Sequence, residues 1–320
     1  MAAPAPAHSL TISGATALAG VLGDPVRHSL SPAMHNAALR ALGLDWVYLA
    51  LPVSAAGLES AVRALELLDC RGLNVTLPHK PAACGLAAEL SPLARRLGAV
   101  NTLVRRPQGG WFGTNTDVAG FLAPLQVPGE NWSGRRAVVL GTGGSARAVL
   151  AGLLELGLER ITLAGRRPEP LAALLAACQR WQEDAASPLP ATRMEAVAWQ
   201  EPGASAGADD ELTTALQGCQ LLVNTTPVGM ASGGDPLAVQ RSPLTRSQLD
   251  QLDGATVYDL IYTPRPTALL DQAMARGCRG LDGLEMLVQQ GAAALRLWSG
   301  REEVPVAAMR QAALASLEPA

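Results

Sequence analysis

Polar side chains gather in four short segments of the first 120 residues, and each segment could bind or react with a small polar molecule. The segments are residues 24–32, 74–80, 98–102 and 113–120. Ser29 and Ser31 stand at the start of a predicted helix, where free backbone N–H groups favour an anion such as a carboxylate. Ser31 could equally serve only as the helix cap, and both interpretations stay open at this point.

Lys80 and Asp117 are the members of these segments best suited to proton chemistry. Lys80 follows a predicted strand that ends at Pro78, which is where ligands bind in open α/β sheets. A lysine there could act as an acid or could polarise a carbonyl, but it could also be a surface residue at a helix start. Asp117 begins a predicted helix, so an N-cap role competes with a catalytic one.

Three histidines, His28, His35 and His79, lie in or near the same segments and are candidates for a catalytic base. Their spacing matches no metal site, and no carboxylate is fixed beside them in the sequence. We therefore interpret all three as ordinary polar residues, expect no metal, and expect His35 to face outward on its helix.

A glycine loop between a predicted strand and a predicted helix organises the second half of the chain. The strand ends at Leu140, and the loop has the spacing G-x-G-x-x-A at Gly141, Gly143 and Ala146. In a Rossmann-type unit these positions permit a tight turn, a close approach to a pyrophosphate and close packing of helix on strand. Glycine-rich strand exits also serve plain packing, but the strand–loop–helix context favours a nucleotide.

Two arginines follow the next predicted strand, at Arg166 and Arg167. An NAD site usually carries an acidic residue there, about 20 residues after the loop, to bind the ribose 2′-hydroxyl. An arginine can instead hold a 2′-phosphate with two hydrogen bonds. The pair therefore favours NADP over NAD, although two solvated arginines at a strand end are the alternative.

The length and composition predict a globular chain of two domains. Hydrophobic residues make up 48% of the 320 residues, which is enough for two full cores. A net charge of −3 gives no reason to expect nucleic-acid binding, and no apolar run is long enough to cross a membrane. The five scattered cysteines and the lack of a secretory signal suit structural thiols in a reducing cytoplasm.

Alternating strand and helix signals indicate an α/β fold throughout. Residues 1–18 are expected to be a flexible tail, residues 19–127 a substrate-binding and catalytic domain with a mixed sheet, and residues 132–283 a Rossmann-type NADP-binding domain. Residues 128–131 are the predicted linker. Helices within residues 284–320 are expected to pack back on the first domain. The predicted strands are residues 19–23, 46–51, 72–77, 99–104, 111–113, 137–140, 161–164, 194–198, 221–224 and 256–260.

Taken together, the motifs resemble those of the shikimate dehydrogenase family, from about residue 19 to the C-terminus. They are Ser29-x-Ser31-Pro32, Asn74-Val75-Thr76-x-Pro78-x-Lys80, Ala99-Val100-Asn101-Thr102, Asn115-Thr116-Asp117, the glycine loop, Asn224-Thr225-Thr226-Pro227-Val228-Gly229-Met230, the segment 258–264 and the segment 282–290. Members of this family reduce 3-dehydroshikimate to shikimate with NADPH. The resemblance implies the same small-molecule substrate, the same cofactor and a place in aromatic amino-acid biosynthesis.

The resemblance also implies roles for individual residues. Ser29, Ser31 and Tyr262 would hold the substrate carboxylate, and Thr76, Lys80, Asn101, Asp117 and Gln290 would hold the ring hydroxyls and the carbonyl. Lys80 and Asp117 would be the catalytic pair. The cofactor would contact Gly141, Thr142, Gly143, Gly144, Ser145, Gly165, Arg166, Arg167, Leu260 and Gly283. Substrate would bind between the two domains, where closure excludes water.

Three departures from the family pattern and three rival functions qualify this resemblance. The family's nucleotide turn often reads Asn-Arg-Thr and carries a second arginine three residues after the turn. Here the turn is Gly165-Arg166-Arg167 and that later place is Pro170, so Arg167 could replace the missing arginine. The N-terminal tail and residues 182–210 also depart from the family pattern. A quinate-oxidising relative that uses NAD or NADP is the close rival. A ligand-sensing module without catalysis would be expected to lose Lys80 or Asp117, and a folate-linked dehydrogenase is disfavoured by the Ser-x-Ser segment. Whether the chain is a monomer or a homodimer stays open.

Overall fold

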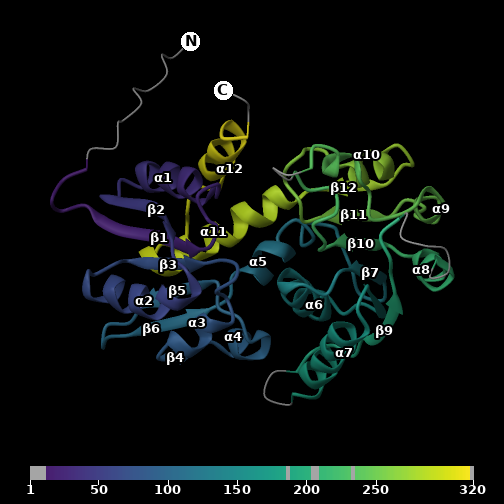
Figure 1. The fold of residues 1–320 in the computed structure, drawn as a ribbon, viewed down its shortest axis with the longest axis horizontal. Helices are drawn as coiled ribbons and strands as arrows, with labels where there is room; N and C mark the ends of the chain where they lie inside the picture. The colour runs from purple at the N-terminus through teal and green to yellow at the C-terminus, as the bar shows by residue number, and fades with distance from the viewer. Residues whose placement is uncertain (1–11, 185–187, 203–208, 232–234, 318–320) are drawn as a thin grey trace, which may run out of the picture. The chain divides into compact units, whose positions relative to one another are not determined.

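The structure, a computed structural model, describes residues 12–184, 188–202, 209–231 and 235–317 (Figure 1). The chain divides into two compact units. Unit 1 comprises the chain up to Thr116 together with the residues from Val288 onward, and unit 2 is Asp117–Leu287. Most of the predicted N-terminal tail, residues 1–11, lies outside the described residues. The domain limits derived from the sequence stay predictions.

Unit 1 is built on a six-stranded sheet in the order β2-β1-β3-β5-β6-β4. Its strands are β1 (Ala17–Gly23), β2 (Trp46–Pro52), β3 (Gly72–Val75), β4 (Glu89–Leu90), β5 (Thr102–Arg105) and β6 (Trp111–Thr114). β1 runs parallel to β2 and β3, whereas β5 pairs antiparallel with β3 and β6. The predicted mixed sheet is therefore confirmed.

Short helices follow the strands of unit 1. They are α1 (Ser31–Ala41), α2 (Leu58–Leu67), α3 (Ala82–Leu86) and α4 (Pro92–Leu97), with a 3₁₀ turn at Ala55–Gly57. Helix α1 carries Pro32 in its first turn, where the fixed φ of proline suits a helix and no N–H is needed. Helix α4 likewise begins at Pro92 and is capped by the Ser91 side chain, which accepts from the Ala94 N–H at 3.0 Å.

Helix α12 (Val306–Ala315) and most of helix α11 (Gly283–Ser299) belong to unit 1. α11 enters unit 1 at Val288, and α12 packs against α1 (Figure 1). Near the end of α11, the Trp298 indole donates to the Leu103 carbonyl at 3.0 Å. A Cβ at Gly72 would lie 2.2 Å from that indole, so only glycine leaves room for it on β3.

His35 lies on the buried face of α1, so the expectation that it faces outward is wrong. Its ring is fully buried and stacks on Tyr48 at 4.1 Å, with Trp298 at 5.6 Å on a tilt. The ring Nδ1 lies 2.9 Å from the Ser31 carbonyl. The physical reason for the error is that His35 is covered by Tyr48 of β2 and Trp298 of α11, which the local sequence around His35 does not reveal.

Unit 2 is built on a six-stranded parallel sheet in the order β12-β11-β10-β7-β8-β9. The strands are β7 (Arg136–Leu140), β8 (Arg160–Gly165), β9 (Arg193–Ala198), β10 (Leu221–Asn224), β11 (Thr256–Asp259) and β12 (Arg279–Leu281). Read from β9, this is the 3-2-1-4-5-6 order of a Rossmann sheet, so the predicted fold class is confirmed. Among these six strands, only the short β12 was not predicted from the sequence.

Seven helical segments of the described chain surround this sheet or connect its strands. They are α5 (Asp117–Leu122), α6 (Gly144–Glu155), α7 (Pro168–Glu183), α8 (Asp209–Leu216), a 3₁₀ turn at Ala238–Gln240, α9 (Arg246–Leu249) and α10 (Ala268–Met274). Helix α5 packs on α6. Its Phe121 ring also stacks on Tyr258 of β11, with 5.2 Å between the ring centres. Most side chains of α6 are buried, which explains its run of Ala, Val and Leu.

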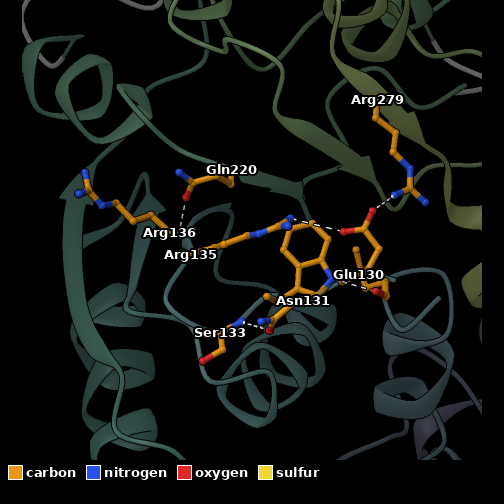
Figure 2. Close-up of polar contacts among 9 residues, drawn as sticks. Glu130, Asn131, Ser133, Arg135, Arg136, Gln220 and Arg279 are labelled. Atoms are coloured by element: carbon orange, nitrogen blue, oxygen red, sulfur yellow. Dashed lines mark hydrogen bonds and ion pairs between the residues drawn. The ribbon is translucent and has the colours of Figure 1, made fainter. Parts of the chain in front are cut away.

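The segment predicted to be a linker is anchored inside unit 2 (Figure 2). Glu130 accepts from Arg135 at 3.4 Å and from Arg279 of β12 at 2.9 Å. The Trp132 indole donates to the Leu125 carbonyl at 2.8 Å and carries the Arg135 guanidinium over its face. These contacts fix residues 130–135 against the sheet just before β7.

Candidate functional site

The glycine loop lies at the carboxyl end of β7, between β7 and β10, where the strand order of the sheet reverses. Gly141 has a φ of +103°, and a Cβ there would lie 2.6 Å from Thr225 Oγ1. Thr225 in turn donates to the Leu140 carbonyl at 2.7 Å. Gly141 is thus required both by its conformation and by the close approach of the loop after β10.

Gly143 and Ala146 also fit a nucleotide loop. Gly143 is the N-cap of α6, and no described atom lies within 4 Å of a Cβ built on it, so space in front of the helix N-terminus is open. Ala146 is fully buried, and its amide donates to the Gly143 carbonyl at 3.1 Å. The free N–H groups of such a terminus favour phosphate oxygens.

A pocket of about 180 Å³ joins the glycine loop to the two arginines predicted to read the 2′-phosphate. Its walls are Gly141, Thr142, Gly143, Arg166, Arg167, Trp199, Thr225, Thr226 and Pro227. The structure thus brings together five of the predicted cofactor residues. Gly144 and Ser145 continue from the loop into α6, and Gly165 ends β8 directly before the arginines.

Four residues that line the pocket were not assigned a cofactor contact from the sequence. Thr225, Thr226 and Pro227 follow β10, and the signal for them was their position at a strand end next to the glycine loop. Trp199 follows β9; its indole donates to the Pro243 carbonyl at 3.0 Å. The Arg166 guanidinium lies 5.9 Å from the centre of the Trp199 ring and 4.0 Å from Glu201, which holds it at the pocket wall.

Leu260 and Gly283, also predicted to contact the cofactor, lie against one another. A Cβ at Gly283 would lie 1.9 Å from the Leu260 carbonyl oxygen, and the Gly283 N–H donates to Ile261 at 3.1 Å. Neither residue lines the pocket described above. Tyr262, two residues after Leu260, is partly buried, and burial raises the pKa of its hydroxyl.

Asp259 is a buried carboxylate that ties the loops after β10 and β11 together. Its Oδ1 accepts from Asn224 at 3.0 Å and from the Ile261 N–H at 3.2 Å, while its Oδ2 accepts from Thr267 at 2.7 Å. Asn224 also accepts from the Thr226 hydroxyl at 2.7 Å. Burial raises the pKa of Asp259 to about 6, and these hydrogen bonds oppose the rise.

The serine pair of unit 1 lies at the start of α1. Ser31 is the first residue of the helix and is buried, whereas Ser29 is partly exposed and accepts from the Ser31 N–H at 3.2 Å. Leu30 occupies the N-cap position and makes no side-chain cap, so capping by Ser31 does not account for that serine. The Ser31 hydroxyl is left for other partners.

The segments around Lys80 and Asn101 are joined by a backbone hydrogen bond from Val100 to the Lys80 carbonyl at 2.9 Å. Thr76 lies just past the end of β3, and its N–H donates to Leu22 at 2.8 Å. His79 is buried with Nε2 only 2.6 Å from the Val53 carbonyl, which agrees with a structural role. Lys80 itself is half-buried.

Lys80 is also the only lysine in the chain, whose Lys and Arg residues number 25 in all. Arginine takes every other basic position, although it carries the same charge. The difference between the two side chains is that arginine cannot release a proton near neutral pH, whereas lysine can. This composition signal was available in the sequence and was missed there.

Asn101 is the centre of the polar groups in unit 1. Its buried amide donates to Thr116 at 3.1 Å and to Gln290 at 3.3 Å, and its Oδ1 accepts from the Thr116 N–H at 2.7 Å. Two predicted substrate residues, 189 positions apart, thus meet in unit 1. Asp117 is buried and begins α5 of unit 2, whereas Lys80 lies in unit 1, so the pairing of the two residues stays a prediction. The grouping of Tyr262, also in unit 2, with Ser29 and Ser31 of unit 1 likewise stays a prediction.

Among the described residues, no group of three or more His, Cys, Asp or Glu side chains is placed to hold a metal ion. Within the same part of the chain, no helix combines the length and apolarity needed to cross a membrane.

The parallel sheet, its strand order and the pocket at its switch point define a two-unit α/β protein of the Rossmann dinucleotide-binding class. Family models narrow this class. Residues 21–103 match the shikimate dehydrogenase substrate binding domain, and residues 283–314 match the shikimate 5′-dehydrogenase C-terminal domain.

Similar proteins agree with these matches. The chain is 48% identical to the shikimate dehydrogenase (NADP(+)) of Synechococcus sp. (strain JA-2-3B'a(2-13)), over 94% of this chain and 96% of the relative. The chain therefore belongs to the shikimate dehydrogenase family.

Two solved structures show the same fold. One is the shikimate 5-dehydrogenase of Thermus thermophilus with NADP(H) and shikimate, 36% identical with a TM-score of 0.77, covering 94% of this chain and 100% of that one. The other is the Listeria monocytogenes enzyme with shikimate and NAD, 30% identical with a TM-score of 0.80, covering 94% of this chain and 97% of that one.

Proposed function

We propose that this chain catalyses the reversible, NADP-dependent reduction of 3-dehydroshikimate to shikimate, the reaction of aromatic amino-acid and chorismate biosynthesis. The observation that carries the proposal is the family relationship, at 48% identity over nearly the whole chain, together with the presence of Lys80 as the only lysine. A sensing module without catalysis has no need of a proton-releasing amine where arginine serves everywhere else.

The nucleotide pocket supports NADP as the cofactor. Gly141 and Gly143 leave room for a pyrophosphate at the N-terminus of α6, and Arg166 and Arg167 present two guanidinium groups where a 2′-phosphate would lie. Among the described residues, no acidic side chain lines this pocket to bind a free ribose hydroxyl. NADPH, when bound, supplies the hydride that reduces the ring ketone.

The residues of unit 1 would bind and orient the substrate. Ser29 and Ser31 would hold its carboxylate, with Tyr262 as the third partner. Thr76, Asn101 and Gln290 would hold the ring hydroxyls. The hydrogen bond between the Asn101 and Gln290 side chains supports this role, because it brings the two amides together. Fixing the ring by several hydrogen bonds presents its carbonyl in one orientation, which lowers the entropic part of the barrier.

Lys80 and Asp117 would supply the proton chemistry. In reduction the Lys80 ammonium would donate a proton to the developing alkoxide, and in oxidation the neutral amine would take it back. Asp117 would hold the lysine in place and stabilise its charged form. Leu260 and Gly283 would complete the cofactor site together with Gly144, Ser145 and Gly165.

A quinate and shikimate dehydrogenase that accepts NAD is the second candidate. It is kept because the Listeria monocytogenes relative was solved with shikimate and NAD. The arginine pair argues against a preference for NAD in this chain.

We further propose a cytoplasmic enzyme that acts as a monomer or a homodimer on a small-molecule substrate alone. All five cysteines are free, four of them buried, and burial raises the pKa of Cys178 and Cys219 to about 12. Such thiols stay protonated and unreactive, which fits a structural role.

The proposal is tested by incubating the purified protein with NADPH and 3-dehydroshikimate. Loss of nicotinamide absorbance together with chromatographic appearance of shikimate is expected. Loss of absorbance at an equal rate without 3-dehydroshikimate, or a product other than shikimate, would contradict it.

A further inference from the structure

A chain of buried contacts runs through unit 1 between Ser31 and Gln290, made of hydrogen bonds and one stacked pair of rings. Its middle members are Tyr48 on β2, Asn74 on β3 and Thr102 on β5, none of which has a role in substrate binding so far. We call these three residues the buried relay. The Tyr48 side chain is fully buried, as is Thr102, and Asn74 is 5% exposed.

The first half of the chain connects Ser31 to Asn74. The Tyr48 hydroxyl donates to Asn74 Oδ1 at 2.7 Å. Burial raises the pKa of Tyr48 well above its usual value, and the Ser31 side chain opposes this rise. The Tyr48 ring also stacks on His35, whose Nδ1 lies 2.9 Å from the Ser31 carbonyl, so Ser31 is linked to the phenol through His35.

The second half connects Asn74 to the amides that would hold the substrate ring. Asn74 and Thr102 face each other across the antiparallel pair of β3 and β5. Asn74 Nδ2 donates to Thr102 Oγ1 at 3.2 Å, and Thr102 donates to Asn101 Oδ1 at 2.9 Å. Asn101 then donates to Gln290 at 3.3 Å.

His35 contacts both Tyr48 and the first turn of α1. Its ring stacks on the phenol with an interplanar angle of 6°. Burial lowers the pKa of His35 to about 4, so the ring is neutral near pH 7 and its Nδ1–H can donate to the Ser31 carbonyl. The stack fixes the phenol ring, and the hydrogen bond fixes the first turn of α1.

We propose that the buried relay of Tyr48, Asn74 and Thr102 consists of positioning residues that set the distance between the carboxylate-binding Ser31 and the hydroxyl-binding Asn101 and Gln290. The inference rests on the proposed function, because it takes those three residues as substrate ligands. Buried polar groups are costly unless every partner is present, so three of them in series specify one arrangement of their neighbours. Apolar residues would fill the same core without fixing a spacing.

Two variants interrupt the relay while preserving its shape. Tyr48→Phe keeps the stack on His35 and removes only the hydroxyl, and Thr102→Val keeps the β-branched volume and removes Oγ1. Each is expected to lower kcat/KM for shikimate about 5- to 30-fold, mainly through KM, because a buried partner is lost. The KM for NADP is expected to change less than about twofold, because the pocket of unit 2 is untouched.

Two matched controls separate positioning from loss of folding. Thr102→Ser restores the hydroxyl and is expected to restore the shikimate KM. Tyr258→Phe removes another buried phenol oxygen, one without a hydrogen-bond partner among the described residues, and is expected to leave both KM values unchanged. Thermal unfolding of every variant shows which of them remain folded at the assay temperature.

The double variant Tyr48→Phe/Thr102→Val gives the decisive readout. If both residues act through one relay, its loss of shikimate affinity is smaller than the product of the two single losses. Independent, multiplicative losses, a Thr102→Ser variant as impaired as Thr102→Val, or a parallel rise in the NADP KM would overturn the inference. Failure of the unmodified protein to bind shikimate by calorimetry would overturn the proposed function and with it this inference, whereas normal binding in both single variants would overturn the inference alone.

Discussion

Lys80 carries the sharpest prediction about a single side chain. Lys80→Ala is expected to lower kcat by about two to four decades, the usual contribution of a positioned acid or base, while the KM for shikimate changes much less. Lys80→Arg keeps the charge but cannot give up a proton, so it is expected to be nearly as slow. Steady-state kinetics of both variants measure the effect.

The arginine variant distinguishes two chemical roles for Lys80. If Lys80→Arg kept more than about a tenth of the unmodified kcat, the residue would be acting by electrostatic polarisation instead of proton transfer. Because Lys80 is the only lysine in the sequence, amine-directed acylation also reports on it directly. Protection of Lys80 by bound shikimate, detected by mass analysis, would support its place in the substrate site.

Arg166 and Arg167 govern the prediction about cofactor choice. Replacing both with alanine is expected to raise the KM for NADP by about one to two decades and to leave the KM for NAD nearly unchanged, because a charge-assisted contact to the 2′-phosphate is lost. Arg180→Ala removes an exposed arginine of α7 away from the pocket and serves as the control. Equal rises in both KM values would show that the pair does not read the phosphate.

His35 shows where reasoning from neighbouring residues reached its limit. A histidine within a run of alanine and polar residues suggests an exposed position, but its environment is made by Tyr48 and by Trp298 of α11, far away in the sequence. The residues of the glycine motif could be predicted from their neighbours. At Gly141 a glycine is required by the positive φ of the turn and by the close approach of Thr225 after β10. Local geometry could therefore be predicted, whereas burial by a returning helix could not.

The loops after β10 and β11 give a prediction about pH. Burial raises the folded-state pKa of Asp259 to about 6, above the value of 3.8 for a free aspartate. The folded protein thus binds this proton more tightly than the unfolded chain does. The contribution of Asp259 to the free energy of unfolding is greatest below about pH 4, falls as the pH rises toward 6 and then levels off, by roughly 2–3 kcal/mol in all.

Asp259→Asn removes this titration while keeping an oxygen for Asn224 and an amide for Thr267. The variant is expected to lose less stability between pH 4 and 6.5 than the unmodified protein, as measured by urea unfolding at several pH values. Asp250→Asn, at an exposed ion pair with Arg276, is the control and should leave the slope unchanged. Parallel stability curves for Asp259→Asn and the unmodified protein would refute the assignment.

The contact between β3 and α11 predicts a specific intolerance to side-chain volume. Gly72→Ala would place a methyl group 2.2 Å from the Trp298 indole, so it is expected to lower the free energy of unfolding by about 1–3 kcal/mol. Gly85→Ala in α3, where no described atom lies within 4 Å, should not destabilise and could stabilise by reducing chain entropy. Equal stability of the two variants, measured by denaturant unfolding, would contradict the close packing.

Elements with a clear period or turn signal were predicted well. Strands β7, β8 and β10 each differ from their predicted limits by one residue or less at the start, because apolar runs bounded by turns mark buried parallel strands. β12 was missed because its sequence, Arg279-Gly280-Leu281, has almost no apolar pattern of its own. Its strand character comes from pairing with β11.

The assignment of elements to the two units depends on contacts that no local pattern encodes. α5 was expected with the first domain, but it packs on α6 and groups with unit 2. The return of α12 to α1 was predicted only from architecture, since a helix beyond the last strand of a Rossmann sheet must pack somewhere. The family resemblance added the substrate and the residue roles, which neither periodicity nor composition supplies.

The central claim is that the whole protein is an NADP-dependent shikimate dehydrogenase, and one kinetic comparison tests it most directly. The measurement is kcat/KM, from the rise of nicotinamide absorbance, for shikimate and for quinate, each with NADP and with NAD. We expect shikimate with NADP to be the best pair, and to exceed shikimate with NAD by at least about tenfold, because only NADP engages the arginine pair. No turnover of shikimate with either cofactor, or equal values with NADP and NAD, would contradict the account.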